Sequence, residues 1–257
     1  MIKEEIKFQD STVLEGLTSI SALLGAREAG INDREIIKIM FDRAKKEKKA
    51  RELAFLRAKC QELGILLVET TAEELDQLCI GSTHGGIVAV CGARTLPLPT
   101  AENLPKNGFL CLLEGIEDPY NFGYAVRSLY AAGCDAVLVG ERNWMNAAGV
   151  VARSSAGASE TLPIFSGNPE EAVKIAKKLG YTVVCAGIRD SVSYTEAELK
   201  KPLLLVVGGE KRGVSSGLLS LCDNVVRIDY GRNFRGSLST AACVAVLGFE
   251  ILRQNRQ

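Results

Sequence analysis

Residues 109–123 read FLCLLEGIEDPYNFG, and this stretch contains the pattern on which the fold depends. It begins with five apolar residues, 109–113, a run of strand length in which no polar side chains alternate with the apolar ones. Such a run is typical of a strand whose two faces are both buried in a sheet. Glycine, aspartate and proline follow it, so the sequence predicts a turn and then a helix over residues 121–132.

Apolar runs of strand length recur from this point onward, and stretches with a helical pattern separate them. The predicted strands are residues 109–113, 136–139, 181–186, 203–207 and 225–228, and the predicted helices are 121–132, 169–179 and 237–254. This alternation predicts an α/β fold with a parallel sheet that helices cover on both faces. Ligands of such folds bind beyond the carboxyl ends of the strands, so functional residues are expected in the loops there.

The first part of the sequence predicts a smaller α/β domain. Its expected helices are residues 18–29, 47–63 and 71–78, and its expected strands are 36–41, 65–69 and 87–90. Three prolines between residues 97 and 105 then coincide with a loss of apolar periodicity. We therefore predict a small N-terminal domain at residues 1–95, a linker at 96–107 and a larger domain at 108–257.

Composition narrows the class of protein. No apolar run approaches the about 18 residues of a membrane-spanning helix, and the first residues, MIKEE, lack the apolar core of a signal peptide. The eight cysteines are scattered without a C-x-x-C pair, which predicts reduced, buried thiols and a cytoplasmic protein. The formal net charge is zero, so a nucleic acid would have to bind to a local cluster of positive charge.

Several catalytic chemistries are disfavoured. His84 is the single histidine, which removes most routes to a catalytic triad or a histidine-ligated metal, and we expect it in a turn or at the surface and expect no metal. Gly213–Gly217 matches the hydrolase pattern G-x-S-x-G, but no predicted strand runs directly into it. Gly231–Gly236 has the glycine spacing of a phosphate loop, but Ser237 occupies the position of the lysine.

Three loops at the ends of predicted strands contain the remaining candidates. The first holds the pattern Asp118-Pro119-x-Asn121-x-Gly123-x-x-x-Arg127, in which Asn121 is placed to cap the helix. The second reads GGEKRG at residues 208–213, where glycines let the backbone approach a ligand closely. The third runs over residues 229–239 into an alanine-rich helix, and its hydroxyls at 237, 239 and 240 suit a helix start.

Together these loops resemble the three signature motifs of the SpoU branch of the knotted RNA methyltransferases, in the same order and at similar separations. The second motif matches as Gly208-x-Glu210-x-x-Gly213, and the third as Ser237-Leu238 before the alanine-rich helix. Residues 152–158 (ARSSAGA) match the segment downstream of the first motif. Glu15-Gly16-Leu17 and His84-Gly85-Gly86-Ile87 look like parts of the family's RNA-substrate-binding domain, so the resemblance covers nearly the whole chain.

The resemblance implies a methyl transfer from S-adenosylmethionine to a ribose 2′-hydroxyl of structured RNA, either rRNA or tRNA. It also implies a deep trefoil knot in the domain 108–257, RNA-substrate binding by the domain 1–95, and a homodimer formed through the C-terminal domain. The implied donor contacts are Gly208, Gly209, Glu210, Ile228, Tyr230, Gly231, Ser237 and Leu238.

Arg127 is the catalytic residue that the resemblance implies, and Asn121, Glu210 and Ser237 are expected to orient it or the ribose. A guanidinium is hard to deprotonate, so a role as the literal base strains its chemistry. We therefore expect Arg127 to hold an RNA phosphate or the developing alkoxide, with any role as a base depending on its environment.

The densest positive cluster in the sequence lies in the N-terminal domain. Its members are Arg43, Lys45, Lys46, Lys48 and Lys49. Such a run is often only a solvated helix start. In a domain that resembles an RNA-binding module, we predict that these side chains contact RNA phosphates, which supply most of the affinity in such complexes.

Three positions depart from the family pattern and keep other functions open. Gly209 stands where many members have Asn, Ser239 where Asn is usual, and Ile228-Asp229-Tyr230 replaces a common Ile-Pro-Met. These departures favour an alternative, an RNA-binding protein that keeps the fold but has lost cofactor binding and catalysis. A knotted methyltransferase that acts on a base is a third hypothesis.

Overall fold

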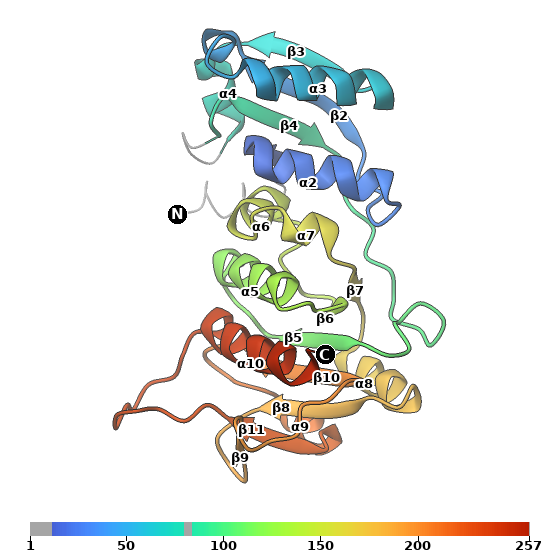
Figure 1. Ribbon diagram of the computed structural model, residues 1–257, viewed down its shortest axis with the longest axis vertical. Coiled ribbons are helices and arrows are strands. Elements are labelled where there is room, and N and C mark those ends of the chain that lie inside the picture. The colour runs from blue at the N-terminus through green and yellow to red at the C-terminus, as the bar shows by residue number, and fades with distance from the viewer. Residues whose placement is uncertain (1–11, 80–83, 257) are drawn as a thin grey trace. The chain divides into compact units, whose positions relative to one another are not determined.

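The computed structural model describes residues 12–79 and 84–256, which form two compact units. The first unit contains the chain up to Thr95 together with Trp144–Thr161, and the second contains Leu96–Asn143 and the chain from Leu162 onward. The chain therefore passes from one unit to the other after residues 95, 143 and 161. Figure 1 traces this path by colour, with the inserted helices α6 (Ala148–Ser154) and α7 (Ala158–Thr161) in yellow-green.

A four-stranded sheet forms the centre of the first unit. Its strand order is β1 (Val13–Glu15), β4 (Ile87–Cys91), β2 (Ile36–Asp42) and β3 (Leu66–Thr70). Only the pair β2–β3 is parallel. Because successive side chains of a strand point to opposite faces, Ile39 and Phe41 pack with α2 (Gly16–Glu28), α3 (Ala50–Leu63) and α6. Met40 packs on the other face with α4 (Ala72–Leu78).

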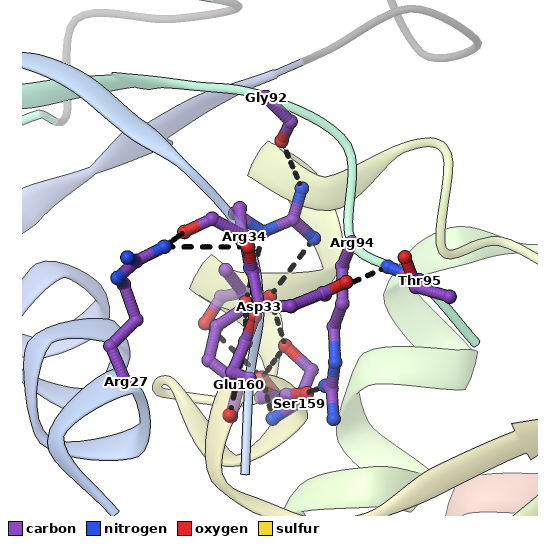
Figure 2. Close-up of polar contacts among 11 residues, drawn as sticks. Arg27, Asp33, Arg34, Gly92, Arg94, Thr95, Ser159 and Glu160 are labelled. Atoms are coloured by element: carbon purple, nitrogen blue, oxygen red, sulfur yellow. Dashed lines mark hydrogen bonds and ion pairs between the residues drawn. The ribbon is translucent and has the colours of Figure 1, made fainter. Parts of the chain in front are cut away.

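A buried ion pair attaches the inserted segment to the rest of the first unit (Figure 2). Arg34 Nε lies 3.0 Å from Glu160 Oε2, and their side chains are 1% and 0% exposed. Asn32 Nδ2 donates to the same carboxylate oxygen at 2.6 Å, and the Arg94 guanidinium donates to the carbonyl of Ser159. Buried charges are stable only when they are paired and hydrogen-bonded, as they are here.

A seven-stranded sheet forms the centre of the second unit, and every strand pair in it is parallel. The strand order is β7 (Ile164–Ser166), β6 (Ala136–Val139), β5 (Phe109–Glu114), β10 (Leu203–Gly208), β8 (Thr182–Ala186), β11 (Asn224–Arg227) and β9 (Val192–Ser193). Helices α8 (Pro169–Lys178) and α9 (Ser216–Leu221) pack on one face (Figure 1). Helices α5 (Pro119–Ala131) and α10 (Thr240–Asn255) pack against each other. The predicted parallel α/β sheet is confirmed.

The structure also tests the predicted burial of the cysteines and the predicted bounds of the helices. Six of the eight cysteines are buried and two are half-buried, and all are free thiols. Over the described ranges, no helix combines the length and the apolar character that crossing a membrane requires. The helix expected over residues 47–63 begins only at Ala50, after a 3-10 turn at Arg43–Lys45.

Candidate active site

Three loops of the second unit leave the carboxyl ends of strands in one parallel sheet. Residues 115–118 follow β5, residues 209–215 follow β10, and residues 228–239 follow β11. Strands β5 and β10 are neighbours, with β6 and β7 on one side of the pair and β8 and β11 on the other. The strands that follow β5 along the chain extend the sheet in one direction, and those beside β10 extend it in the other. The strand order therefore reverses between β5 and β10. Open α/β sheets bind their ligands at such a point.

One carboxylate joins the three loops. Glu210 Oε1 accepts a hydrogen bond from Asn121 Nδ2 at 3.1 Å and another from the backbone N–H of Thr240 at 3.1 Å. The Thr240 hydroxyl donates to the carbonyl oxygen of Gly208 at 3.0 Å. Asn121 belongs to the first predicted motif, Gly208 and Glu210 to the second, and Thr240 starts the helix of the third. We call these four residues the Glu210 junction.

Charged contacts join the first two loops a second time. Lys211 Nζ lies 2.5 Å from Glu117 Oε2, and the Ser215 N–H donates to Glu114 Oε2 at 2.8 Å. The hydrogen bond from Lys211 lowers the pKa of the Glu117 carboxyl below its ordinary value. The contacts of Glu114 and Glu117 were not predicted from the sequence, because charged residues in a turn are common on any protein surface.

Close backbone contacts explain the two glycines that follow β10. A Cβ at Gly208 would lie 2.1 Å from the carbonyl carbon of Gly213. A Cβ at Gly209 would lie 2.1 Å from the carbonyl oxygen of Gly115, which belongs to the first loop. Neither position has room for a side chain. The contact with Gly115 is the physical reason for a glycine at residue 209 of this chain.

Two predicted catalytic residues lie outside the Glu210 junction. Arg127 is exposed on α5, one helical turn after Gly123, and its side chain forms no ion pair or hydrogen bond with the residues in 12–79 and 84–256. Ser237 is likewise exposed and has no hydrogen-bond partner in those ranges. The structure thus brings Asn121, Gly208 and Glu210 together, and it leaves the Arg127 guanidinium open to solvent.

The caps of two helices differ from the prediction. Asp118, rather than Asn121, caps α5, because its carboxylate accepts the N–H groups of Tyr120 at 2.6 Å and of Asn121 at 3.3 Å. The Asn121 side chain is therefore free to reach Glu210. Helix α10 begins at Thr240 instead of residue 237, because the Ser239 hydroxyl accepts the N–H of Ala242 at 3.3 Å and caps it. The sequence places Thr240 at a helix start but does not predict its contacts with Glu210 and Gly208.

The residues expected to hold the methyl donor lie on the second and third loops. Residues 229–237 form no backbone–backbone hydrogen bond with other described residues, so their N–H and C=O groups can serve a ligand. The Tyr230 hydroxyl accepts the N–H of Leu238 at 3.2 Å and closes this loop on itself. Free backbone donors and acceptors can bind the edge of an adenine without charged side chains. The residues present therefore fit S-adenosylmethionine.

The predicted RNA contacts form the turn between β2 and α3 in the first unit, and the last of them, Lys49, is the N-cap residue of α3. Lys46 pairs with Glu69 at 3.0 Å, and this contact lowers the pKa of the Glu69 carboxyl. The remaining cations of the cluster, Arg43, Lys45, Lys48 and Lys49, form no ion pair within the described ranges. The Lys45 side chain lies against Gly86, where a Cβ would be 2.6 Å from its Cδ atom.

His84 lies in the neighbouring turn, as predicted, but it is buried rather than at the surface. Its Nδ1 accepts the N–H of Gly86 at 3.0 Å, and its Nε2 lies 3.0 Å from Asp76 Oδ1. Because Nδ1 is an acceptor, the proton of the neutral ring is on Nε2. The imidazole thus fixes the turn on which Lys45 rests, which is a structural role.

Comparison with known proteins assigns both parts of the chain. Residues 108–249 match the SpoU rRNA Methylase family, and residues 13–97 match the domain described as RNA 2′-O ribose methyltransferase substrate binding. The 23S rRNA (guanosine-2′-O-)-methyltransferase RlmB of Shewanella oneidensis is 31% identical over 202 residues, 75% of this chain and 80% of that protein. RlmB of a Burkholderia species is 28% identical over 249 residues, 94% and 96% of the two chains.

Solved structures share the fold. An RNA 2′-O ribose methyltransferase superposes with a TM-score of 0.77 at 24% identity, covering 98% of this chain and 95% of the other. An AdoMet-bound rRNA methyltransferase from Sinorhizobium meliloti gives a TM-score of 0.76 at 19% identity, covering 100% and 95%. The resemblance seen in the three motif loops is thereby confirmed. The chain belongs to the SpoU rRNA methylase family, whose members are S-adenosylmethionine-dependent RNA ribose 2′-O-methyltransferases.

Proposed function

We propose that this enzyme methylates the ribose 2′-hydroxyl of a guanosine in ribosomal RNA. Relatives that match nearly the whole chain are named for that reaction. The observation that carries the proposal is the Glu210 junction, because it joins the three motif loops at the carboxyl ends of β5 and β10. A site for two ligands, donor and ribose, needs loops from more than one strand in fixed positions.

The proposed donor contacts are the residues of the second and third loops, namely Gly208, Gly209, Glu210, Ile228, Tyr230, Gly231, Ser237 and Leu238. Bound S-adenosylmethionine would supply the methyl group on a sulfonium, which is itself a good leaving group. The protein must then mainly orient the ribose hydroxyl and help to remove its proton. Glu210 Oε2 has no hydrogen-bond partner in the described ranges, so this oxygen is open to a ligand while Oε1 holds the loops.

Arg127 is the proposed catalytic residue. Its guanidinium is exposed and forms no ion pair with the described residues, and it lies one turn after Gly123 on α5, the helix that also contains Asn121. A fixed positive charge there would hold an RNA phosphate and stabilise the alkoxide as the hydroxyl loses its proton. Asn121, Glu210 and Ser237 would position Arg127 or the ribose.

The roles that we propose for the parts of the chain are those of the corresponding domains in the family. Residues 1–95 would bind the RNA substrate through Arg43, Lys45, Lys46, Lys48 and Lys49, residues 96–107 would be the linker, and residues 108–257 would transfer the methyl group and contain a trefoil knot. The free thiols fit the reducing cytoplasm.

A homodimer through the second unit is proposed on the basis of exposed aromatic side chains. Tyr124 and Tyr130 on α5 and Phe249 on α10 are 48%, 52% and 49% exposed, and the two helices pack against each other. Aromatic side chains are enriched at protein–protein interfaces. Light scattering at micromolar concentration should give the mass of two chains.

The test is methylation of RNA that lacks the modification. Purified enzyme, donor with a labelled methyl group and such total RNA are incubated, and the labelled nucleotide is then mapped by nuclease digestion and mass analysis. Label on the ribose of a ribosomal guanosine supports the proposal. Label on transfer RNA or on a base would overturn it.

The alternative of a fold that has lost its cofactor is less well supported. Ser239, one of the departures that favour it, caps α10 through the N–H of Ala242 and so preserves the start of that helix. Calorimetric titration with S-adenosylmethionine separates the two functions, since only the enzyme binds the donor.

A further inference from the structure

The connection between β11 and α10 contains residues that the Glu210 junction does not use. Figure 1 shows it as a long excursion away from the sheet. Every residue from 229 to 237 is exposed, and the tip of the loop reads GRNFRG at residues 231–236. Two positive charges and one aromatic ring are therefore concentrated in four residues, 232–235.

Aromatic contacts order this exposed loop. The rings of Tyr230 and Phe234 lie with their centroids 5.7 Å apart and their planes tilted by 59°. The Phe234 ring also covers Gly236, where a Cβ would lie 2.5 Å from the ring. Phe234 nevertheless remains 55% exposed. The loop thus fixes the position of a phenyl ring and leaves much of its surface to solvent.

The charges beside the ring are not compensated. Arg232 and Arg235 are exposed and form no ion pair with the residues in 12–79 and 84–256. The acidic residue of the loop, Asp229, is already paired with Arg227 at 2.8 Å. In a chain of zero formal net charge, this loop is a local site of excess positive charge.

We propose that the loop tip, residues 232–235, forms a platform for an unpaired nucleotide of the RNA substrate, on which Phe234 stacks against the base while Arg232 and Arg235 contact the flanking phosphates. Proteins bind unpaired bases with aromatic side chains set among cations. The platform and the proposed donor contacts Tyr230 and Ser237 belong to one connection, which leads into Thr240 of the Glu210 junction. The inference rests on the proposed function, since it requires RNA at this site.

The test compares two substitutions of one residue in the full-length enzyme. Phe234→Leu keeps an apolar side chain without a ring face, whereas Phe234→Tyr keeps the ring. With rRNA lacking the modification, Phe234→Leu should raise the KM for RNA about 5- to 100-fold, the range for one lost stacking contact, and Phe234→Tyr should stay near the parent value. The affinity for S-adenosylmethionine, measured by calorimetry, should not change in either variant.

The arginines are tested by salt dependence. Arg232→Gln and Arg235→Gln should each reduce the slope of log affinity for RNA against log salt by roughly 0.7, the value for one contact to single-stranded RNA. Lys178→Gln is the matched control, because Lys178 is an exposed cation without an ion pair among the described residues, at the end of α8 that precedes β8. It should leave the slope unchanged.

Equal KM values for RNA in the Leu and Tyr variants would overturn the platform. Weaker donor binding by Phe234→Leu would overturn it too, because the loop would then belong to the donor site. If the parent enzyme methylates no RNA, the proposed function fails separately. In that case the binding of a fluorescent oligouridine still tests the platform. Phe234→Leu must then bind the oligouridine more weakly than the parent enzyme does.

Discussion

Glu210 holds the three motif loops through one carboxylate oxygen, Oε1. The resemblance to the family implies Asn121 and Glu210 as site residues, and both follow buried strands, where ligands of such folds bind. It does not predict Thr240, whose N–H donates to Glu210 Oε1. That contact depends on where α10 packs relative to β10, and no local pattern contains this information. Sequence therefore predicted the polar loops, while the packing of strands and helices decided which atoms meet.

Arg127→Ala should reduce methyl transfer by on the order of a hundred-fold or more, because a positioned electrostatic group contributes about that much. Donor affinity should stay within a few fold, since Arg127 lies on α5 and the donor loops follow other strands. Arg127→Lys should restore little activity, because one ammonium cannot replace the planar fork. Single-turnover rates and calorimetry measure the two effects. Parent-like turnover by Arg127→Ala would contradict the assigned role.

Cys222 should be the most reactive of the eight thiols. A hydrogen bond from Cys185, and then the charge of Lys177, lower its pKa below the ordinary value, and its side chain is half-buried. Burial instead raises the pKa of Cys91 to about 12. Because the thiolate is the nucleophile, alkylation between about pH 6 and 9 should modify Cys222 first, and Lys177→Gln should shift its rate profile to higher pH. Peptide mass mapping over a pH series would show this, and earlier labelling of Cys91 would contradict it.

At the level of elements, the long apolar runs were predictable and the short elements were not. Strands β5, β6, β8, β10 and β11 all fall on predicted runs, because a strand buried on both faces needs an unbroken apolar sequence. Strands β1 and β9 have three and two residues, too few to show a period. Helix α6 shows no amphipathic pattern because six of its seven residues are buried. Its membership in the first unit depends on contacts with residues more than a hundred positions away, such as the ion pair of Arg153 with Glu15.

The ion pair between Arg34 and Glu160 should contribute to the stability of the first unit, because it joins the inserted segment 144–161 to the rest of that unit. Glu160→Gln should lower the free energy of unfolding of the first unit by about 3 to 5 kcal/mol, because it leaves a buried guanidinium without its counter-charge. Replacing both Arg34 and Glu160 with Met should recover much of that loss, since neither member of the pair is then left as a buried charge without its partner. Urea unfolding measures each variant.

Glu47→Gln is the matched control for this prediction. Glu47 is exposed and forms no ion pair with the described residues, so its substitution should change the free energy of unfolding by less than about 0.5 kcal/mol. A loss for Glu160→Gln no larger than this control would mean that other contacts hold the segment 144–161, such as those of Ala148 and Ala152 in the core and the ion pair of Arg153 with Glu15.

At the level of the whole molecule, zero net charge means that RNA affinity must come from local clusters. Two such clusters are the turn between β2 and α3 in the first unit and the loop between β11 and α10 in the second. The first was visible in the sequence as a run of cations, whereas the second holds only two arginines, Arg232 and Arg235. Only the structure shows which of these cations already pair with a carboxylate, as Lys46 does with Glu69.

The first cluster yields the last prediction. Replacing Lys45, Lys46, Lys48 and Lys49 together with Gln should weaken RNA binding and leave donor affinity unchanged. Each lost phosphate contact should reduce the log–log salt slope by roughly 0.7 to 0.9. Lys46 should contribute least, because its ammonium already hydrogen-bonds Glu69 at 3.0 Å, so restoring Lys46 alone in the quadruple variant should recover little of the slope. Filter binding of rRNA at several salt concentrations gives the slopes. An unchanged slope would show that these lysines form only a solvated surface and that RNA binds elsewhere on the enzyme.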